Sequence, residues 1–358
     1  MEQGVEIEYI DNLQSLSHKN LKFRLLYLFY NKIFKKNHEK YEGFYEPANL
    51  RFIAKQVEKK LKNKKGGIVF SPGTIPIAYL KTDKPIVFWT DATFAVMKDY
   101  YLDFVGLNKR TIKNSNRYEK QSIEKASLAI YSSTWAAESA INDYGANPEK
   151  VKVISYGANI ECKRTESDIL NNNKEKSKNI CKLLFVGQEW ERKGADAAVR
   201  VAEELNKNNI NSELYIVGCT PPDNLQLPEF IKVKGFIKKS EKEGENLMNK
   251  LYNQSHFFIL PTLAECTPIV FSEANSFGLP VITTNTGGIS SIIKNDINGR
   301  MFGENMDVSS AVSYISDIFK NFDKYQKYSL KAFREYQDRL NWQSSATKCL
   351  SYMKDLKS

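Results

Sequence analysis

The chain has 358 residues, of which 42% are hydrophobic and 26% are charged. These values are ordinary for a globular protein, and they exclude a disordered, fibrous or disulfide-stapled chain. No apolar run approaches the roughly 18 residues that a membrane-spanning helix needs. The five cysteines form no CxxC pair, so we expect reduced thiols in a cytoplasm. The length predicts two domains.

The net charge of +10 is concentrated in the first half of the chain. Residues 1–180 contain 30 basic and 21 acidic residues, whereas the remaining residues contain 22 and 21. Basic and apolar residues alternate near the start, where the cations are Lys19, Lys22, Arg24, Lys32, Lys35 and Lys36. This pattern is typical of a segment that contacts an anionic membrane, and equally of a core helix with solvated lysines. No recognition module accompanies the charge, so we expect no nucleic-acid partner.

Short apolar runs alternate with helical patterns along the first half. The predicted strands are 5–10, 67–71, 85–89, 127–131 and 151–154, and the predicted helices are 47–61, 117–126 and 133–144. The polar segment 171–179 has no apolar anchor, which predicts a flexible loop near a domain junction.

The second half repeats the alternation more clearly. The predicted strands are 183–187, 213–218, 231–235, 256–261 and 281–284, with helices near 194–206, 244–253 and 268–277. This order predicts a doubly wound parallel sheet, which binds ligands at the carboxyl ends of its strands. We therefore predict an α/β protein of two Rossmann-like domains facing each other across a cleft. Their predicted bounds are 1–165 and 180–340, with a C-terminal helix at 341–358 packing back on the first domain.

Two carboxylates flank the start of the helix predicted at 268–277. Thr267 is expected to cap this helix, with Pro268 at its first position. The free N–H groups and positive dipole end of such a terminus suit a phosphate. Glu265 lies just before the helix, and Glu273 lies on its apolar stripe. A carboxylate there needs a partner, and the two hydroxyls of a ribose would be suitable.

Two cations follow another predicted strand tip, at Gly187. Arg192 offers a bidentate fork and Lys193 a point charge, so the pair is suited to neutralising a diphosphate and a leaving nucleotide. The alternative is a solvated surface pair at a helix start.

Together these motifs resemble the retaining glycosyltransferases of family four, which have the GT-B fold. Order and spacing match from about residue 127 to residue 342. The segments that carry the resemblance are LLFVGQEWERKG (183–194), the E-x7-E pair of Glu265 and Glu273, TGGISSIIKNDINGRMF (286–302) and the Asn-Trp pair at 341–342.

The resemblance implies a role for each matching residue. Lys193 binds the donor diphosphate together with Arg192, Glu265 accepts hydrogen bonds from the transferred sugar, and Glu273 accepts from the ribose. Backbone N–H groups at the helix start meet the sugar or phosphate, and residues at later strand tips flank the nucleotide. The implied donor-binding set is Glu273, Gly187, Gly218, Phe236, Cys266, Thr267, Pro268, Ile269 and Val270. The family works without a metal, so no metal or cofactor is expected.

Three features depart from the family. It usually has Gly-Arg where this chain has Gly187 and Gln188, and it usually offers a histidine where this chain has Asp91. We expect Asp91 to orient the acceptor or contact the donor sugar; the alternative is a turn-forming Asp that caps a helix at Ala92. Residues 2–14 look like the second strand of a GT-B first domain. The first strand–loop–helix unit is therefore expected to be missing, through truncation, an alternative start or shortening.

The implied function is a retaining, metal-independent hexosyltransferase. It would move a hexose from a nucleotide diphosphate sugar to a hydroxyl of a glycan or lipid-linked saccharide, in cell-envelope polysaccharide biosynthesis. The expected location is the cytoplasm, including the inner face of the membrane. Two alternatives stay open: a sugar-nucleotide epimerase or glycoside phosphorylase of the same fold, and an impaired or truncated transferase that acts as a nucleotide-sugar-binding or partner protein.

Overall fold

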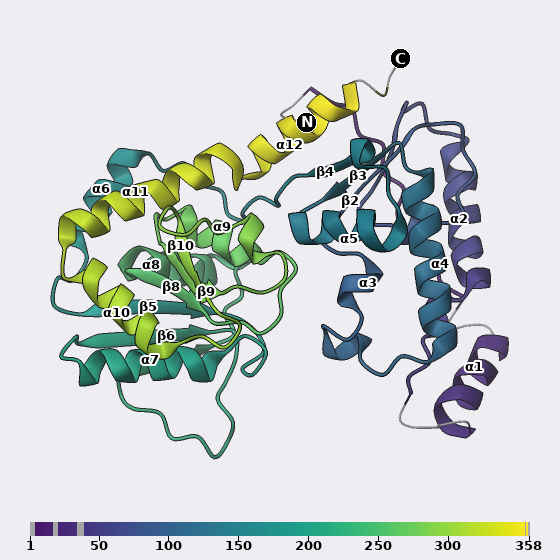
Figure 1. Ribbon diagram of the computed structural model, residues 1–358. Coiled ribbons are helices and arrows are strands. Elements are labelled where there is room, and N and C mark those ends of the chain that lie inside the picture. Colours follow the sequence, from purple (N-terminus) through teal and green to yellow (C-terminus); the bar gives the residue numbers. More distant parts are fainter. Residues whose placement is uncertain (1–3, 17–20, 34–38, 355, 357–358) are drawn as a thin grey trace. The chain divides into compact units, whose positions relative to one another are not determined.

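The computed structural model describes residues 4–16, 21–33, 39–354 and 356, and Figure 1 shows its secondary structure. The chain divides into two compact units. Unit 1 comprises Met1–Ile154 with Ala346–Ser358, and unit 2 comprises Ser155–Ser345. The division thus falls earlier than the predicted bounds of 165 and 180, because residues 155–179 cluster with the second sheet.

Unit 1 is built on a parallel sheet with the strand order β1-β2-β3-β4. Its register pairs Val87 with Leu128, and Ala129 with Val151. The side chains of β2 and β3 are almost all buried, as expected for a parallel sheet with covered faces. The helices and strands of unit 1 are α1 (Leu21–Leu28), α2 (Pro47–Leu61), β1 (Val69–Ser71), β2 (Ile86–Thr90), α3 (Phe94–Met97), α4 (Lys109–Lys125), β3 (Leu128–Tyr131), α5 (Thr134–Tyr144) and β4 (Val151–Val153).

The prediction of a strand over 5–10 is wrong. These residues pair with no described strand, and Val5, Ile7 and Tyr9 are exposed. Instead, the Glu8 carboxylate accepts hydrogen bonds from the backbone N–H groups of Lys65 and Gly66, just beyond α2. The segment is therefore held by side-chain hydrogen bonds to residues beyond α2 rather than by a strand ladder, and it is not the second strand of the sheet.

The basic segment near the start is partly described. Lys19, Lys35 and Lys36 lie outside the described residues, as does the side chain of Lys22. Arg24 and Lys32 are exposed, and the neighbouring Leu21, Leu25, Tyr27, Leu28 and Phe29 are also exposed. The described part of this segment is therefore not a core helix.

Unit 2 is built on a second parallel sheet, with the strand order β10-β9-β8-β5-β6-β7. The chain runs outward from β5 to β7 and then returns to place β8 beside β5. The strand order reverses between β5 and β8, which is the topological switch point at which such sheets bind ligands. The elements of unit 2 are α6 (Glu166–Glu175), β5 (Cys181–Val186), α7 (Ala195–Lys207), β6 (Ser212–Val217), β7 (Ile231–Gly235), α8 (Lys242–Gln254), β8 (Phe257–Leu260), α9 (Ile269–Asn275), β9 (Val281–Thr284), β10 (Gly299–Phe302), α10 (Val308–Phe319) and α11 (Phe322–Arg339).

Helices cover both faces of this sheet. Figure 1 shows α7 and α10 along one face, with α8 and α9 on the other. The central strands β5 and β8 are apolar over most of their length, and Leu183, Phe185 and Phe258 are fully buried. This rigid core holds the loops that follow β5 and β8 in place. The helix α12 (Trp342–Lys354) begins in unit 2 and ends in unit 1.

The prediction of a flexible loop over 171–179 is wrong for its first half. Residues 171–175 complete α6, which Thr165 and Asp168 begin with a reciprocal capping box. Ile169 and Asn173, one turn apart, are buried, and the Asn173 amide donates to the Ser329 hydroxyl at 2.9 Å. The sequence offers no apolar residue to anchor this segment; the buried polar side chain of Asn173 anchors it instead, through its hydrogen bond with the buried Ser329.

Candidate functional site

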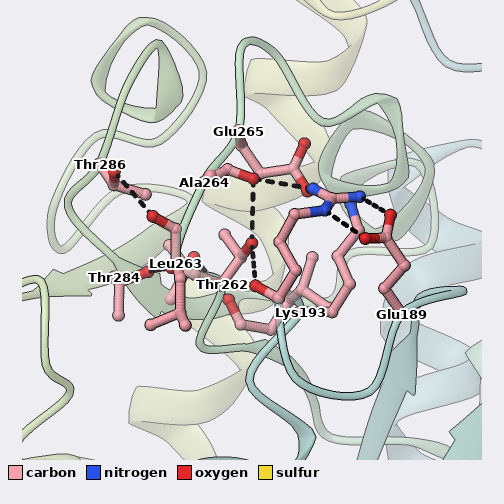
Figure 2. Close-up of polar contacts among 11 residues, drawn as sticks. Glu189, Lys193, Thr262, Leu263, Ala264, Glu265, Thr284 and Thr286 are labelled. Atoms are coloured by element: carbon pink, nitrogen blue, oxygen red, sulfur yellow. Dashed lines mark hydrogen bonds and ion pairs between the residues drawn. The ribbon is translucent and has the colours of Figure 1, made fainter. Parts of the chain in front are cut away.

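The candidate site lies at the switch point of unit 2, where the loops after β5, β8 and β9 meet (Figure 2). The Leu263 N–H donates to the Arg192 carbonyl at 2.8 Å, and the Thr262 hydroxyl donates to the same oxygen at 3.1 Å. The Thr286 hydroxyl donates to the Leu263 carbonyl at 3.3 Å, and the Gly288 N–H donates to the Glu265 carbonyl at 3.2 Å. These bonds tie the three loops into one assembly.

Two glycines allow the strand tips to approach so closely. Gly194 has a φ of +73°, and a Cβ on it would lie 1.9 Å from the Pro261 carbonyl oxygen. Gly218, which follows β6, has a φ of +99°, and a Cβ there would lie 2.7 Å from the Gly187 carbonyl oxygen. Only glycine fits at such positions without displacing backbone. Gly187 and Gly218, both predicted to bind the donor, thus also pack against each other.

Glu265 lies among cations. It is 7% exposed, and its carboxylate accepts from the Lys193 ammonium and, at 3.4 Å, from the Arg192 guanidinium. The structure thus brings together three groups that the sequence analysis singled out, although they come from loops about 70 residues apart in the chain. A carboxylate and an ammonium in contact at a strand tip can hold the polar and anionic ends of one ligand.

Arg192 makes a second set of contacts that the sequence did not indicate. Its Nε donates to Glu189 at 2.9 Å, its Nη2 donates to the other oxygen of Glu189, and its Nη1 donates to the Ala264 carbonyl at 2.9 Å. The Arg192 guanidinium lowers the pKa of the Glu189 carboxyl. The guanidinium thus joins Glu189 on its own loop to Ala264 and Glu265 on the neighbouring loop.

Glu273 on α9 is 2% exposed and has protein partners. The Lys239 ammonium donates to both of its carboxylate oxygens at 2.8 Å, and the Tyr252 hydroxyl of α8 donates at 3.1 Å. Burial and the neighbouring Glu273 raise the pKa of Tyr252 well above its ordinary value. Sequence reasoning required a partner for Glu273 but missed Lys239, because a lysine 34 residues away carries no spacing signal.

The start of α9 differs from the prediction. The helix begins at Ile269, and its N-cap residue is Pro268, whose ψ of 108° is extended. Thr267 therefore does not cap the helix, and Pro268 lies outside it. Cys266 and Thr267 are buried beside Glu265, whereas Ile269 and Val270 are half-buried.

Two further predicted site residues, Phe236 and Asp91, follow other strands. Phe236 directly follows β7 and is 70% exposed, so its ring stands in solvent. Asp91 belongs to unit 1, where it directly follows β2; burial raises the pKa of its carboxyl. The alternative that Asp91 caps a helix at Ala92 is wrong, because α3 begins at Phe94 with Thr93 as its N-cap.

Within the described ranges, no group of three His, Cys, Asp or Glu side chains is placed to hold a metal ion. His256 is a core residue: its Nδ1 accepts from the Lys182 N–H at 3.0 Å, and its Nε2 lies 2.9 Å from the Ser177 carbonyl oxygen. Burial lowers the pKa of His256 to about 3. Among the helices that the structure describes, none has the length and apolar character required to span a bilayer.

Comparison with known proteins finds a family model that matches part of the second unit. Residues 166–335 match the family model described as Glycosyl transferases group 1. This segment lies within unit 2 and contains the whole cluster around Glu265 and Glu273. The match supports that family for this part of the chain.

Two curated relatives and one solved structure are similar to the chain. The D-inositol 3-phosphate glycosyltransferase of Rhodococcus opacus (strain B4) is 22% identical over 191 residues, 51% of this chain and 43% of the relative. The UDP-Gal:alpha-D-GlcNAc-diphosphoundecaprenol alpha-1,3-galactosyltransferase of Escherichia coli is 27% identical over 183 residues, 49% of this chain and 47% of the relative. The aligned part thus spans less than half of either relative. The crystal structure of Anabaena HepE in complex with UDP matches with a TM-score of 0.64 and 14% identity, covering 85% of this chain and 82% of that one. The similarity shows the GT-B fold.

Proposed function

We propose that this protein is a glycosyltransferase that moves a hexose from a nucleotide diphosphate sugar to a hydroxyl acceptor. The observation that carries the proposal is the contact between Lys193 and Glu265 at the switch point of a parallel sheet, with the buried Glu273 on the helix that follows. A cation and two carboxylates at such a place match the three parts of a nucleotide sugar: diphosphate, hexose and ribose.

Each group has a role that its chemistry allows. Lys193 binds the donor diphosphate and stabilises the negative charge that develops on the leaving group. Glu265 accepts hydrogen bonds from the hexose, and Glu273 accepts from the ribose hydroxyls. Phe236, exposed beyond β7, and Gly218 flank the nucleotide. The residues Cys266, Thr267, Pro268, Ile269 and Val270 line the start of α9 beside the sugar and phosphate.

The reaction that we propose retains the anomeric configuration and uses no metal. The acceptor hydroxyl attacks from the face that the leaving phosphate occupies, within an oxocarbenium-like ion pair, and the leaving phosphate oxygen takes the acceptor proton. The protein then contributes mainly positioning and stabilisation of charge. The strand-tip cations carry the electrostatic task that a metal ion performs elsewhere.

The acceptor side belongs to unit 1 in this proposal. Asp91 orients the acceptor or contacts the hexose. The acceptor is a saccharide or a lipid-linked saccharide of the cell envelope, in keeping with the lipid-linked sugar in the name of the Escherichia coli relative. The exposed Leu21 and Leu25, together with Arg24 and Lys32, are suited to contact with an anionic membrane at its inner face.

The test is a screen followed by turnover measurements. A panel of nucleotide sugars is first screened by thermal shift, because a ligand that binds the native state raises Tm. Transfer is then measured for Lys193→Ala and Glu265→Gln beside Lys207→Ala, which removes an exposed lysine of α7. We expect each site variant to lose on the order of 10²–10³ in rate and the Lys207 variant to lose nothing. Undiminished turnover of Lys193→Ala would contradict the proposal.

Two control reactions separate the alternatives that share this fold. Incubation of the donor alone reveals an epimerase if an isomerised sugar forms without acceptor. Addition of inorganic phosphate reveals a phosphorylase if a sugar phosphate forms, with phosphate taking the place of the nucleotide diphosphate. Nucleotide binding without any transfer would instead support a binding or partner protein, for which Gln188 in place of the family's arginine is the feature to examine first.

A further inference from the structure

Glu189 lies in the loop between β5 and α7, four residues before Lys193, and its side chain is 54% exposed. It occupies both outer N–H positions of the Arg192 fork, since Nε donates to one carboxylate oxygen and Nη2 to the other. A bidentate pair of this kind fixes the plane of the guanidinium as well as its position.

The third nitrogen of Arg192 points to the neighbouring loop. Nη1 donates to the Ala264 carbonyl at 2.9 Å and to the Glu265 carboxylate at 3.4 Å. The backbone of Arg192 contacts the same loop, because its carbonyl accepts from the Leu263 N–H and the Thr262 hydroxyl. Arg192 therefore contacts the loop that carries Glu265 through both its side chain and its backbone.

We infer that Glu189 is a positioning residue for the donor site: it holds the Arg192 guanidinium against Ala264 and Glu265, and so withholds this guanidinium from the donor's diphosphate. The inference rests on the proposed function and changes one part of it. Lys193 is then the cation that meets the phosphate, and Arg192 acts through Glu265. A guanidinium that turned to the phosphate would give up its contact with the loop that carries Glu265.

The competing explanation is an exposed ion pair without consequence. Pairs between exposed side chains contribute little to stability, and the Glu189 side chain is 54% exposed. Unit 2 offers a matched pair for comparison: Glu204 and Lys207 on α7 are also three residues apart, but Lys207 is 68% exposed, whereas Arg192 is 19% exposed. The two pairs differ because Arg192, besides its pair with Glu189, contacts Ala264 and Glu265 on the neighbouring loop.

The test compares Glu189→Gln, Arg192→Lys, their double variant and Glu204→Gln. For each we measure kcat, the KM for the donor and the Kd for UDP, GDP and ADP by calorimetry, with Tm as a check on folding. We expect Glu189→Gln to lower kcat about 10- to 100-fold, since small displacements at a reacting centre have effects of that order. We expect it also to tighten nucleoside diphosphate binding several-fold, because Arg192 can then turn to the phosphate.

The remaining variants decide whether Glu189 positions Arg192 for the reaction or has only a structural role. Arg192→Lys is expected to lower kcat to a similar extent without tightening nucleotide binding, because an ammonium cannot bridge both loops. The double variant is expected to lose no more than Arg192→Lys alone, as for two residues that act as one unit. Glu204→Gln is expected to match the wild type in every measurement.

Wild-type kcat in Glu189→Gln, or losses that add in the double variant, would overturn the inference. A wild-type protein that binds none of the three diphosphates and transfers no sugar would overturn the proposed function itself. The two failures are thus distinguishable.

Discussion

Replacement of Lys239 by Met tests how strongly Glu273 depends on its counter-ion. The lysine donates two hydrogen bonds to a carboxylate that is 2% exposed, and the Tyr252 hydroxyl donates a third. Lys239→Met leaves the carboxylate with the Tyr252 hydrogen bond and without its cation.

The expected cost follows from the burial of the two partners. Removing one partner from a fully buried ion pair costs about 3–5 kcal/mol, and a hydrogen bond to a charged group contributes about 1.5–3 kcal/mol. The Lys239 side chain is 42% exposed, so water reaches the position that it vacates and the lower range applies. We expect a loss of about 2 kcal/mol. This corresponds to a fall in Tm of about 4–8 °C for a unit of this size.

The assay is thermal unfolding with and without a nucleoside diphosphate. The control Lys238→Met removes the adjacent lysine, whose pair with Glu241 is 62% exposed on both sides, and it is expected to leave Tm unchanged. Adding Glu273→Gln to Lys239→Met is expected to recover stability, because a neutral amide needs no cation. If ribose binds Glu273, the diphosphate raises the Tm of Lys239→Met more than that of the wild type. A Lys239→Met protein as stable as Lys238→Met would refute the reasoning.

Three further predictions concern the loops, the junction and unit 1. Gly194→Ala places a Cβ 1.9 Å from the Pro261 carbonyl oxygen at a φ of +73°, where an L-residue already costs about 1–2 kcal/mol; we expect lower Tm and lower transfer, and an unchanged Tm would contradict this. Gly157→Ala places a Cβ 2.2 Å from the Trp342 backbone nitrogen at the start of α12. We therefore expect the variant to unfold at a lower urea concentration than the wild type. An unchanged urea midpoint would show that α12 shifts without loss of stability. Burial raises the pKa of Glu119 to about 8; the folded state then holds a proton that the unfolded state releases, so stability falls as pH rises from about 4.5 to 8. We expect the wild type to lose up to a few kcal/mol relative to Glu119→Gln over that range, and parallel urea profiles of the two proteins would show that Glu119 ionises normally.

The local spacing of apolar residues predicted most of the fold. The strand at 281–284 and the helix at 47–61 coincide with β9 and α2, because apolar spacing and the prolines and glycines that bound these segments act over a few residues. The same pattern places Lys193 and Glu265 after strands, and parallel topology brings the carboxyl ends of such strands to one edge. Membership of the candidate site was therefore predictable for these two residues.

Other features depended on partners that are distant in the chain. Residues 5–10 have an alternating pattern but form no ladder, since Glu8 finds its hydrogen bonds beyond α2. The start of α9 shifted by one residue because the extended ψ of Pro268 excludes it from the helix.

The amino-acid sequence by itself determined the alternation of strands and helices, the glycines at the strand tips, and the residue types that we propose bind a nucleotide sugar. Only the tertiary structure decided that Lys239 pairs with Glu273 and that Glu189 holds Arg192 against Ala264 and Glu265. The physical reason is range. Periodicity and capping act within a few residues, whereas an ion pair forms wherever the fold brings opposite charges together, and a lysine or glutamate looks the same in the sequence whether its partner is water or a buried carboxylate.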